Sequence, residues 1–270
     1  MTNDHKLFVE IVWTYYIQNK RDLPWRKPEP DGTYDPYKIL VSEIMLQQTQ
    51  ASRVLEPYAR FLSIYPTVQH LAHANQGDVI NLWQGLGYNR RARYLYESAK
   101  LITHTYDGIV PDVLDNLVKL PGVGSNTAGA ILAYAYNHPV IFIETNIRTV
   151  YIYHFYNGVE KVDDGLILEQ LRRTIDLENP RNWYYALMDY GVYLKKEKGN
   201  FSRSSKHYRK QSRFDGSNRQ LRGKILRLLS VQPHTKTQII KTFADARTET
   251  VLEDLVSEKM IRWDGIEYRL

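Results

Sequence analysis

The chain has 270 residues, of which 43% are hydrophobic and 24% charged, a balance typical of a folded protein and not of a disordered one. A chain this long exceeds what one hydrophobic core usually holds, so we expect two or three domains. The complete lack of cysteine excludes disulfides, thiolate-bound zinc, iron–sulfur clusters and a cysteine nucleophile. Since no run of 18 apolar residues is present and the N-terminus has no secretory-signal pattern, we expect a cytoplasmic protein without membrane spans.

The net charge of +6 is concentrated in one segment. Residues 195–213 hold eight Lys or Arg and one acid, Glu197, so this segment carries +7 and the rest of the chain −1. Such a block fits phosphate binding, because each neutralised phosphate releases a condensed counterion. It fits a solvated linker equally well. Within it, Lys206, Arg209 and Lys210 are our candidate phosphate contacts.

Helical periodicity runs through most of the chain. A helix with an apolar stripe is predicted over 5–18, and the Pro- and Gly-rich residues 19–33 form a loop. Asp35-Pro36 predicts the capped start of a helix that reaches about residue 48. Further helices are predicted at 51–64, 67–73, 76–84, 88–105, 112–119, 125–136 and 145–156. No series of alternating strands precedes residue 258, so we predict a mostly α fold.

The last part of the chain has a different pattern. Three short helices, predicted at 219–229, 235–243 and 247–258, precede two short extended runs joined by Asp264-Gly265, a strong hairpin signal. Three helices and a hairpin predict a winged helix-turn-helix. That fold binds DNA in some proteins and serves only protein contacts in others.

A glycine-rich turn lies between two predicted helices at residues 120–124, with the sequence LPGVG. Its two glycines let the backbone approach a ligand closely, and the helix that follows aims its free amides at that ligand. With the flanking helices, the turn indicates a helix-hairpin-helix motif that binds phosphate. An ordinary helix–helix connection closed by glycine remains an alternative.

Two acids stand at positions suited to chemistry. Glu43 lies in a mostly apolar octet over 39–46, where burial in a cleft would raise its pKa so that it holds a proton near neutral pH. On the polar edge of an amphipathic helix it would be an ordinary surface acid. Glu144 ends the apolar run 140–143, either complementing a helix dipole or standing beside a reaction centre. Two carboxylates that flank a C–N glycosidic bond are the minimum for its hydrolysis through an oxocarbenium-like state.

Six motifs occur in order along the chain: LPWR at 23–26, SEIMLQQTQ at 42–50, LWQGLGYNRRAR at 82–93, LPGVGSNTAGAIL at 120–132, ETNIRTV at 144–150 and ALMDYG at 186–191. Through them the chain resembles the helix-hairpin-helix (HhH-GPD) base-excision DNA glycosylases and, among these, the MutY-type adenine DNA glycosylases. The resemblance spans roughly residues 7–192. It implies a two-lobed helical core that holds a flipped base between its lobes. The expected parts are one lobe at 1–28 and 137–194, a second at 29–136, a basic DNA-contacting linker at 195–216 and the winged helix at 217–270.

The resemblance also implies roles for individual residues. Glu43 would be the general acid that protonates adenine, and Glu144, supported by Asn146, would stabilise the oxocarbenium ion. Gln48 and Tyr88 match residues that wedge into the duplex around the extruded nucleotide. Backbone amides of the hairpin would grip a phosphate, and a monovalent cation is a candidate additional ligand of the 120–124 backbone. The other expected DNA contacts are Gln47, Arg90, Arg91, Gly122, Val123, Gly124 and Ser125.

Four departures from the family pattern are visible. Glu144 stands where the family has aspartate, which extends the side chain by about 1–1.5 Å. Asn126 stands where bifunctional relatives carry the Schiff-base lysine, so it is a candidate catalytic-pocket residue and we expect no lyase activity. The four cysteines that follow ALMDYG in most relatives are missing, with Lys195 at the first position, and a winged helix takes the place of the Nudix-like domain. No cofactor is therefore expected.

We expect a monomeric, nucleoid-associated, monofunctional DNA glycosylase that removes adenine mispaired with guanine or 8-oxoguanine from double-stranded DNA. A thymine or uracil glycosylase acting on G mismatches is the first alternative, since these enzymes share the scaffold. The second alternative is a DNA-binding protein without catalysis, because the hairpin, the basic stretch and the winged helix would each survive the loss of chemistry.

Overall fold

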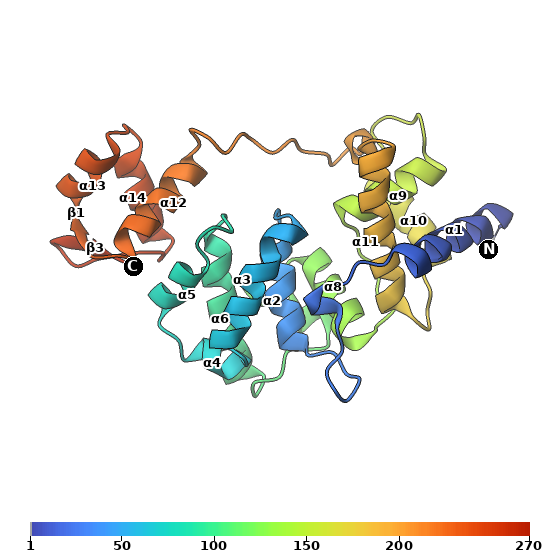
Figure 1. Ribbon diagram of the computed structural model, residues 1–270, viewed down its shortest axis with the longest axis horizontal. Coiled ribbons are helices and arrows are strands. Elements are labelled where there is room, and N and C mark those ends of the chain that lie inside the picture. Colours follow the sequence, from blue (N-terminus) through green and yellow to red (C-terminus); the bar gives the residue numbers. More distant parts are fainter. Residues whose placement is uncertain (1) are drawn as a thin grey trace. The chain divides into compact units, whose positions relative to one another are not determined.

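The computed structural model describes residues 2–270 (Figure 1). The chain divides into two compact units. Unit 1 comprises residues 1–40, 112–118 and 123–210, and unit 2 comprises 41–111, 119–122 and 211–270. The first boundary falls inside helix α2 (Pro36–Leu46). This division differs from the lobes predicted from the sequence in that it joins residues 29–40, 112–118 and 123–136 to unit 1 and residues 211–270 to unit 2.

Unit 1 is helical. Its elements are α1 (Asn3–Asn19), the 3-10 turn η1 (Pro24–Arg26), α7 (Leu114–Leu117), α8 (Ser125–Tyr136), α9 (Thr145–Phe155), α10 (Asp164–Thr174), α11 (Pro180–Glu197) and the 3-10 turn η2 (Phe201–Ser204). Helices α9 and α11 lie side by side, and α1 and α8 also pack on α11 (Figure 1). The α8 helix belongs here because Tyr134 stacks on Tyr185 of α11, with 4.6 Å between ring centroids.

Aromatic side chains fill the core of unit 1. The Phe8 ring of α1 lies 5.1 Å from that of Tyr151 and 6.0 Å from that of Trp183. Tyr184 is fully buried, stacks on Phe142 at 4.1 Å and donates a hydrogen bond to the Val140 carbonyl at 2.7 Å. These contacts hold the extended run 140–143 against α11, so the chain reaches the start of α9 along a fixed path.

A buried carboxylate joins two motifs that are far apart in the sequence. Asp189 of α11 has a side chain only 1% exposed and accepts two hydrogen bonds from the Arg26 guanidinium, at 2.8 and 2.9 Å. It also accepts a hydrogen bond from the backbone amide of Arg21 at 2.9 Å and forms an ion pair with the Arg21 side chain. The LPWR and ALMDYG motifs are therefore two halves of one ion-pair cluster within unit 1.

Unit 2 contains the end of α2 with α3 (Ala51–Ile64), α4 (Val68–Ala72), α5 (Gln76–Leu82) and α6 (Arg90–Thr105). Helix α4 packs along α6 (Figure 1). The buried side chains of this part of unit 2 include Phe61, Leu71, Trp83, Leu95 and Ile102. The predicted mostly α fold is confirmed, and the helices that were predicted have ends shifted by a few residues at most. Helices α10 and α11 had no predicted range. The predicted cap of α2 is present, since the Asp35 carboxylate accepts the amides of Tyr37 at 2.8 Å and Lys38 at 3.3 Å.

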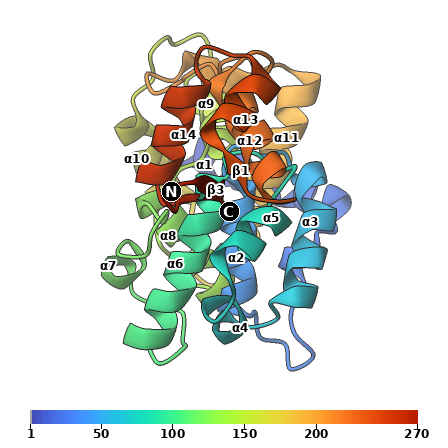
Figure 2. The ribbon, with the colours of Figure 1, turned by 90° about the vertical axis from the view of Figure 1, so that its left-hand side faces the viewer.

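The C-terminal segment, residues 218–270, holds α12 (Asn218–Leu229), β1 (His234–Thr235), α13 (Lys236–Phe243), α14 (Thr248–Ser257), β2 (Arg262–Trp263) and β3 (Glu267–Arg269) (Figure 2). Its strands form an antiparallel sheet in the order β1-β3-β2, with Trp263 opposite Tyr268. The three predicted helices and the hairpin are all present. The β1 strand was not predicted, because two residues are too few to show alternation.

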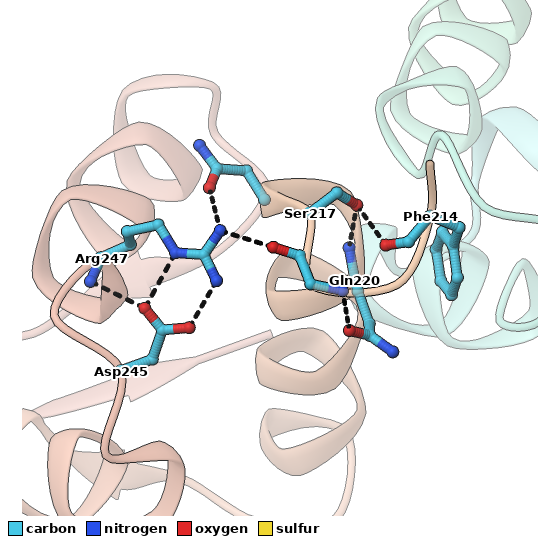
Figure 3. A network of polar contacts seen from close by, with 7 residues as sticks. Phe214, Ser217, Gln220, Asp245 and Arg247 are labelled. Atoms are coloured by element: carbon cyan, nitrogen blue, oxygen red, sulfur yellow. Dashed lines mark hydrogen bonds and ion pairs between the residues drawn. The ribbon is translucent and has the colours of Figure 1, made fainter. Parts of the chain in front are cut away.

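A polar network ties the start of the C-terminal segment to the loop between α13 and α14 (Figure 3). Ser217 caps α12 by accepting the Gln220 amide. Arg247 pairs with Asp245 at 2.6 Å and donates to the Gly216 carbonyl at 2.7 Å and to the Asn218 side chain at 3.1 Å. One guanidinium thus fixes the entry into α12 against the α13–α14 loop. In the part of the chain that the structure describes, no helix has the length and apolar character needed to cross a membrane.

Replacing Asp189 by alanine should lower the free energy of unfolding by about 3 kcal/mol or more, because it leaves two guanidinium groups without their buried partner. Urea unfolding followed by circular dichroism measures the loss. Asp22→Ala is the matched control: the Asp22–Lys27 pair is largely exposed, and its loss should cost less than about 1 kcal/mol. Equal effects of the two substitutions would contradict a structural role for the Asp189 cluster.

Candidate active site

Glu43 lies on α2, whose apolar side chains are almost completely buried. Leu40, Val41, Ile44 and Met45 are at most 1% exposed, and the neighbouring Ser42 is also buried. Glu43 itself is half-buried. It therefore lies on the side of this helix turn that is not fully buried.

A buried guanidinium holds the end of α2. Arg91 of α6 is 6% exposed and donates to the carbonyls of Ile44 at 2.9 Å, Met45 at 2.8 Å and Gln47 at 2.6 Å. These are carbonyls that a helix end leaves without intrahelical partners. The same guanidinium donates to the loop before α6, at the Gly87 carbonyl (2.9 Å) and the Leu86 carbonyl (3.3 Å), and to the Thr49 hydroxyl (3.1 Å).

This arrangement corrects one expectation. We predicted that Arg91 contacts DNA, but its side chain is enclosed and committed to the backbone of unit 2, so we assign it to the scaffold. Desolvation lowers the pKa of Arg91 to about 10, which leaves the group charged at neutral pH. The charge strengthens each hydrogen bond to a carbonyl.

The two expected wedge residues lie on the turns that Arg91 secures. Gln48 has φ of +54° and Tyr88 has φ of +48°, a left-handed conformation that non-glycine residues adopt only where the surroundings enforce it. Gln48 is exposed. The Tyr88 hydroxyl accepts hydrogen bonds from Gln211 and Arg219, and the Arg219 guanidinium lies 5.0 Å from the Tyr88 ring centroid.

Two other expected DNA contacts of unit 2 also have protein partners. The exposed Arg90 pairs with Glu258, which binds Arg222 as well. The Gln47 side chain donates to the Gly122 carbonyl at 3.0 Å. Gln47 therefore links the end of α2 to the glycine-rich turn.

The glycine-rich turn has the geometry that the sequence suggested. Gly122 has φ of +78°, and a Cβ there would lie 2.9 Å from the Cβ of Tyr94, so a larger residue would be strained and crowded. Val123 is buried, whereas Gly124 and Ser125 are exposed. Gly124 is the N-cap of α8, and no side chain caps this helix end. An uncapped helix start of this kind is a common site for anions.

Two carbonyls of this turn accept hydrogen bonds from protein side chains. The Pro121 carbonyl accepts the Ser98 hydroxyl at 2.9 Å, and the Gly122 carbonyl accepts Gln47. Protein donors therefore hold the backbone at which the resemblance suggests a monovalent cation. Such a cation stays a prediction.

Glu144 is the N-cap residue of α9, yet its side chain makes no capping hydrogen bond. Desolvation raises the pKa of its carboxyl to about 7, against the opposing influence of the positive charges on Lys195 and Arg148. Arg148 is itself paired with Asp164, at 2.6 and 2.8 Å. The carboxyl is thus free of a structural hydrogen bond within its helix start and titrates near neutral pH.

Asn146 is fixed from α11. Its side-chain oxygen accepts a hydrogen bond from the Lys195 ammonium at 2.7 Å, and its amide lies 3.8 Å from the Met188 sulfur. Lys195 was not among the predicted site residues. Its one sequence signal is that residues 188, 191 and 195 share a face of α11, and only the tertiary structure shows that this face meets Asn146.

Asn126 is exposed, and its side-chain oxygen accepts the Ile143 amide at 3.3 Å. This contact ties the start of α8 to the residue before Glu144, all within unit 1. The side chain offers a carboxamide, with no amine that could form a Schiff base.

The basic stretch consists of a packed part and an exposed part. Lys195 belongs to the last turn of α11, and the next residues are anchored by a parallel bridge between Val162 and Ser205 and by Phe201, whose ring lies 4.9 Å from that of Tyr153. Beyond it, Lys206, Arg209 and Lys210 are exposed, and Lys206 makes a surface ion pair with Asp163 at 3.3 Å.

The residues after α11 do not fit an iron–sulfur cluster. The sequence has no thiol to ligate iron, and the Lys195 ammonium, at the position of the first family cysteine, is directed to Asn146. Across residues 2–270, no three His, Asp or Glu side chains gather as metal ligands.

Comparison with known proteins places these features in context. Residues 41–172 match the family described as HhH-GPD superfamily base excision DNA repair protein. The adenine DNA glycosylase of Mycolicibacterium smegmatis is 31% identical over 274 residues, covering 94% of this chain and 92% of the relative. That of Buchnera aphidicola subsp. Baizongia pistaciae is 34% identical over 190 residues, covering 70% of this chain and 53% of the relative.

The chain thus spans about half the length of the first curated relatives that it matches. Among solved structures, a thermostable thymine-DNA glycosylase aligns with a TM-score of 0.62 and 26% identity, covering 76% of this chain and 96% of that one.

Arg91→Lys should lower the free energy of unfolding by about 3 kcal/mol, because one ammonium cannot reach all the oxygens that the guanidinium satisfies and several stay buried without a donor. Denaturant unfolding measures this loss. Arg53→Lys serves as control, since Arg53 donates to the Gly85 carbonyl at 2.6 Å from an exposed position and should change stability by less than about 0.5 kcal/mol. An Arg91→Lys protein as stable as this control would refute the scaffold role.

Proposed function

Because the chain belongs to the HhH-GPD superfamily of base excision DNA repair proteins and, within it, to the adenine DNA glycosylases, we propose that it hydrolyses the N-glycosidic bond of adenine mispaired with guanine or 8-oxoguanine in duplex DNA. The observation that carries this proposal is the state of Glu144. Glu144 is half-buried, and its carboxyl is not spent on capping α9. The positive charges of Lys195 and Arg148 favour its ionised form, which is the form that stabilises a transient positive charge.

In the proposed reaction, Glu43 acts first. Its half-buried carboxyl donates a proton to the adenine ring, which turns the base into a better leaving group. The C1′–N9 bond then breaks, its electron pair leaves with the adenine, and positive charge develops on the sugar.

Glu144 acts on that charge. Its carboxylate stabilises the oxocarbenium ion and directs water to C1′, supported by Asn146. The water adds and gives up a proton, which leaves an abasic site and free adenine. Since Asn126 supplies no amine, we propose that the strand is not cleaved and that the enzyme is monofunctional.

The proposed DNA contacts follow from exposure. The uncapped start of α8, with Gly124 and Ser125 at the surface, is suited to one phosphate, and the exposed Lys206, Arg209 and Lys210 are suited to others. Gln48 and Tyr88 would enter the duplex to offset the cost of unstacking the extruded base. We propose that the protein acts in this way as a monomer in the cytoplasm.

Single-turnover excision at fixed salt on four duplexes tests the substrate: A opposite 8-oxoguanine, A opposite G, T opposite G and U opposite G. We expect excision from the two adenine duplexes, with the strand cut only after alkali. Preference for T or U would support the alternative to which the thymine-DNA glycosylase neighbour points and would reject the adenine assignment.

Glu43→Gln should reduce adenine excision by about 10²–10⁴-fold while DNA affinity at the same salt stays within a few-fold, because the amide cannot donate an acidic proton. Glu56→Gln, an exposed substitution on α3, controls for the loss of one negative charge and should retain the parental rate. Near-normal excision by a folded Glu43→Gln protein would overturn the mechanism.

A further inference from the structure

Three contacts from α11 converge on Asn146 at the start of α9. The Lys195 ammonium donates to its side-chain oxygen at 2.7 Å, the Met188 sulfur lies 3.8 Å from its side-chain nitrogen, and Gly191 lies against its backbone. A Cβ on residue 191 would come within 2.6 Å of the Asn146 carbonyl oxygen. The missing side chain at 191 therefore sets how closely α11 approaches and brings residue 195, one turn later, within reach of Asn146.

The same ammonium is a charge partner of Glu144. Lys195 is half-buried, and desolvation lowers its pKa, an effect that the nearby Glu144 carboxylate opposes. The charged groups that face Glu144 are Lys195 from α11 and Arg148 from its own helix. Asp164, on the neighbouring α10, binds the Arg148 guanidinium through both oxygens and offsets its charge. Of these two cations, Arg148 is therefore paired with a carboxylate. Lys195 forms no ion pair within residues 2–270, the part of the chain that the structure describes.

We propose that Lys195 is a positioning residue for the proposed glycosylase reaction: it fixes the Asn146 side chain, two residues from Glu144, and places a positive charge near the start of α9. This inference rests on the proposed function. It separates Lys195 from the rest of the basic stretch, whose exposed members are proposed to contact phosphate. The geometry at Asn146 needs a long cationic side chain, and α11 supplies it at the position where the family resemblance places a cluster cysteine.

Two substitutions of Lys195 test the proposal. Lys195→Met keeps an unbranched side chain of similar length and removes the charge and the hydrogen-bond donor, whereas Lys195→Arg retains both. The readouts are the single-turnover excision rate between pH 5.5 and 9 on A opposite 8-oxoguanine, and DNA affinity at fixed salt. Lys6→Met, on an exposed surface of α1, removes one positive charge without touching the site and serves as the matched control.

Lys195→Met should lower the excision rate at pH 7.5 by about 10–100-fold, with DNA affinity within about threefold of the parent. The acidic limb of its pH profile should move to higher pH by about one unit, because Glu144 loses a cation that lowers its pKa. As the pH falls, a carboxylate with a higher pKa becomes protonated at a higher pH, so the activity that depends on it is lost sooner. Lys195→Arg should recover most of the rate, and Lys6→Met should match the parent.

The proposal is overturned if Lys195→Met keeps the parental rate and pH profile, and equally if its loss is confined to DNA affinity and scales with salt, as a phosphate contact would. A titration of the Glu144 carboxyl by carbon NMR in protein labelled at glutamate, assigned with Glu144→Gln, needs no substrate. An unchanged Glu144 pKa in Lys195→Met refutes the inference. An inactive parental protein that shows the predicted pKa shift refutes only the proposed function.

Discussion

The arrangement of unit 2 depends on one guanidinium. Arg91 is enclosed and carries its charge at neutral pH. Its guanidinium donates hydrogen bonds to carbonyl and hydroxyl oxygens. Removing such a group from water is costly, and the cost is offset only when every N–H finds an acceptor in good geometry. The backbone at 44–49 and at 86–88 meets that requirement. The left-handed turns at Gln48 and Tyr88 are the conformations in which those carbonyls can converge on one point.

Much of the fold is visible in the sequence because its signals are local. Helix periodicity, the Asp35-Pro36 cap and the Asp264-Gly265 turn each depend on residues a few positions apart, and the structure has the elements that they predict. The motif order identifies the superfamily for a similar reason: several long patterns in register leave little room for another interpretation. The two-residue strand β1 has no local signal, since its pairing with β3 across 33 residues is what defines it.

The parts of the candidate site that the sequence did not predict depend on tertiary contacts. Arg90 and Arg91 are adjacent and chemically identical, yet one is exposed and the other is buried, because α6 turns its faces by about 100° per residue. The role of Lys195 was hidden in a similar way. From composition it belongs to a basic stretch, whereas the helix places it on the face that meets Asn146. A charge count cannot separate a solvent-facing lysine from one directed into the protein.

The cluster around Asp189 has a consequence for how this chain can change over evolutionary time. Arg21 and Arg26 both depend on the one buried carboxylate, so its loss in the presence of both arginines leaves uncompensated charge inside unit 1. Losing the arginines first leaves a buried anion, which is no better. Losing Asp189 first is therefore harmful, and so is losing both arginines first, although a joint replacement of the three by apolar residues could pack well. Mutations at these positions should show strong epistasis, and the three residues should persist or disappear together among descendants of this sequence.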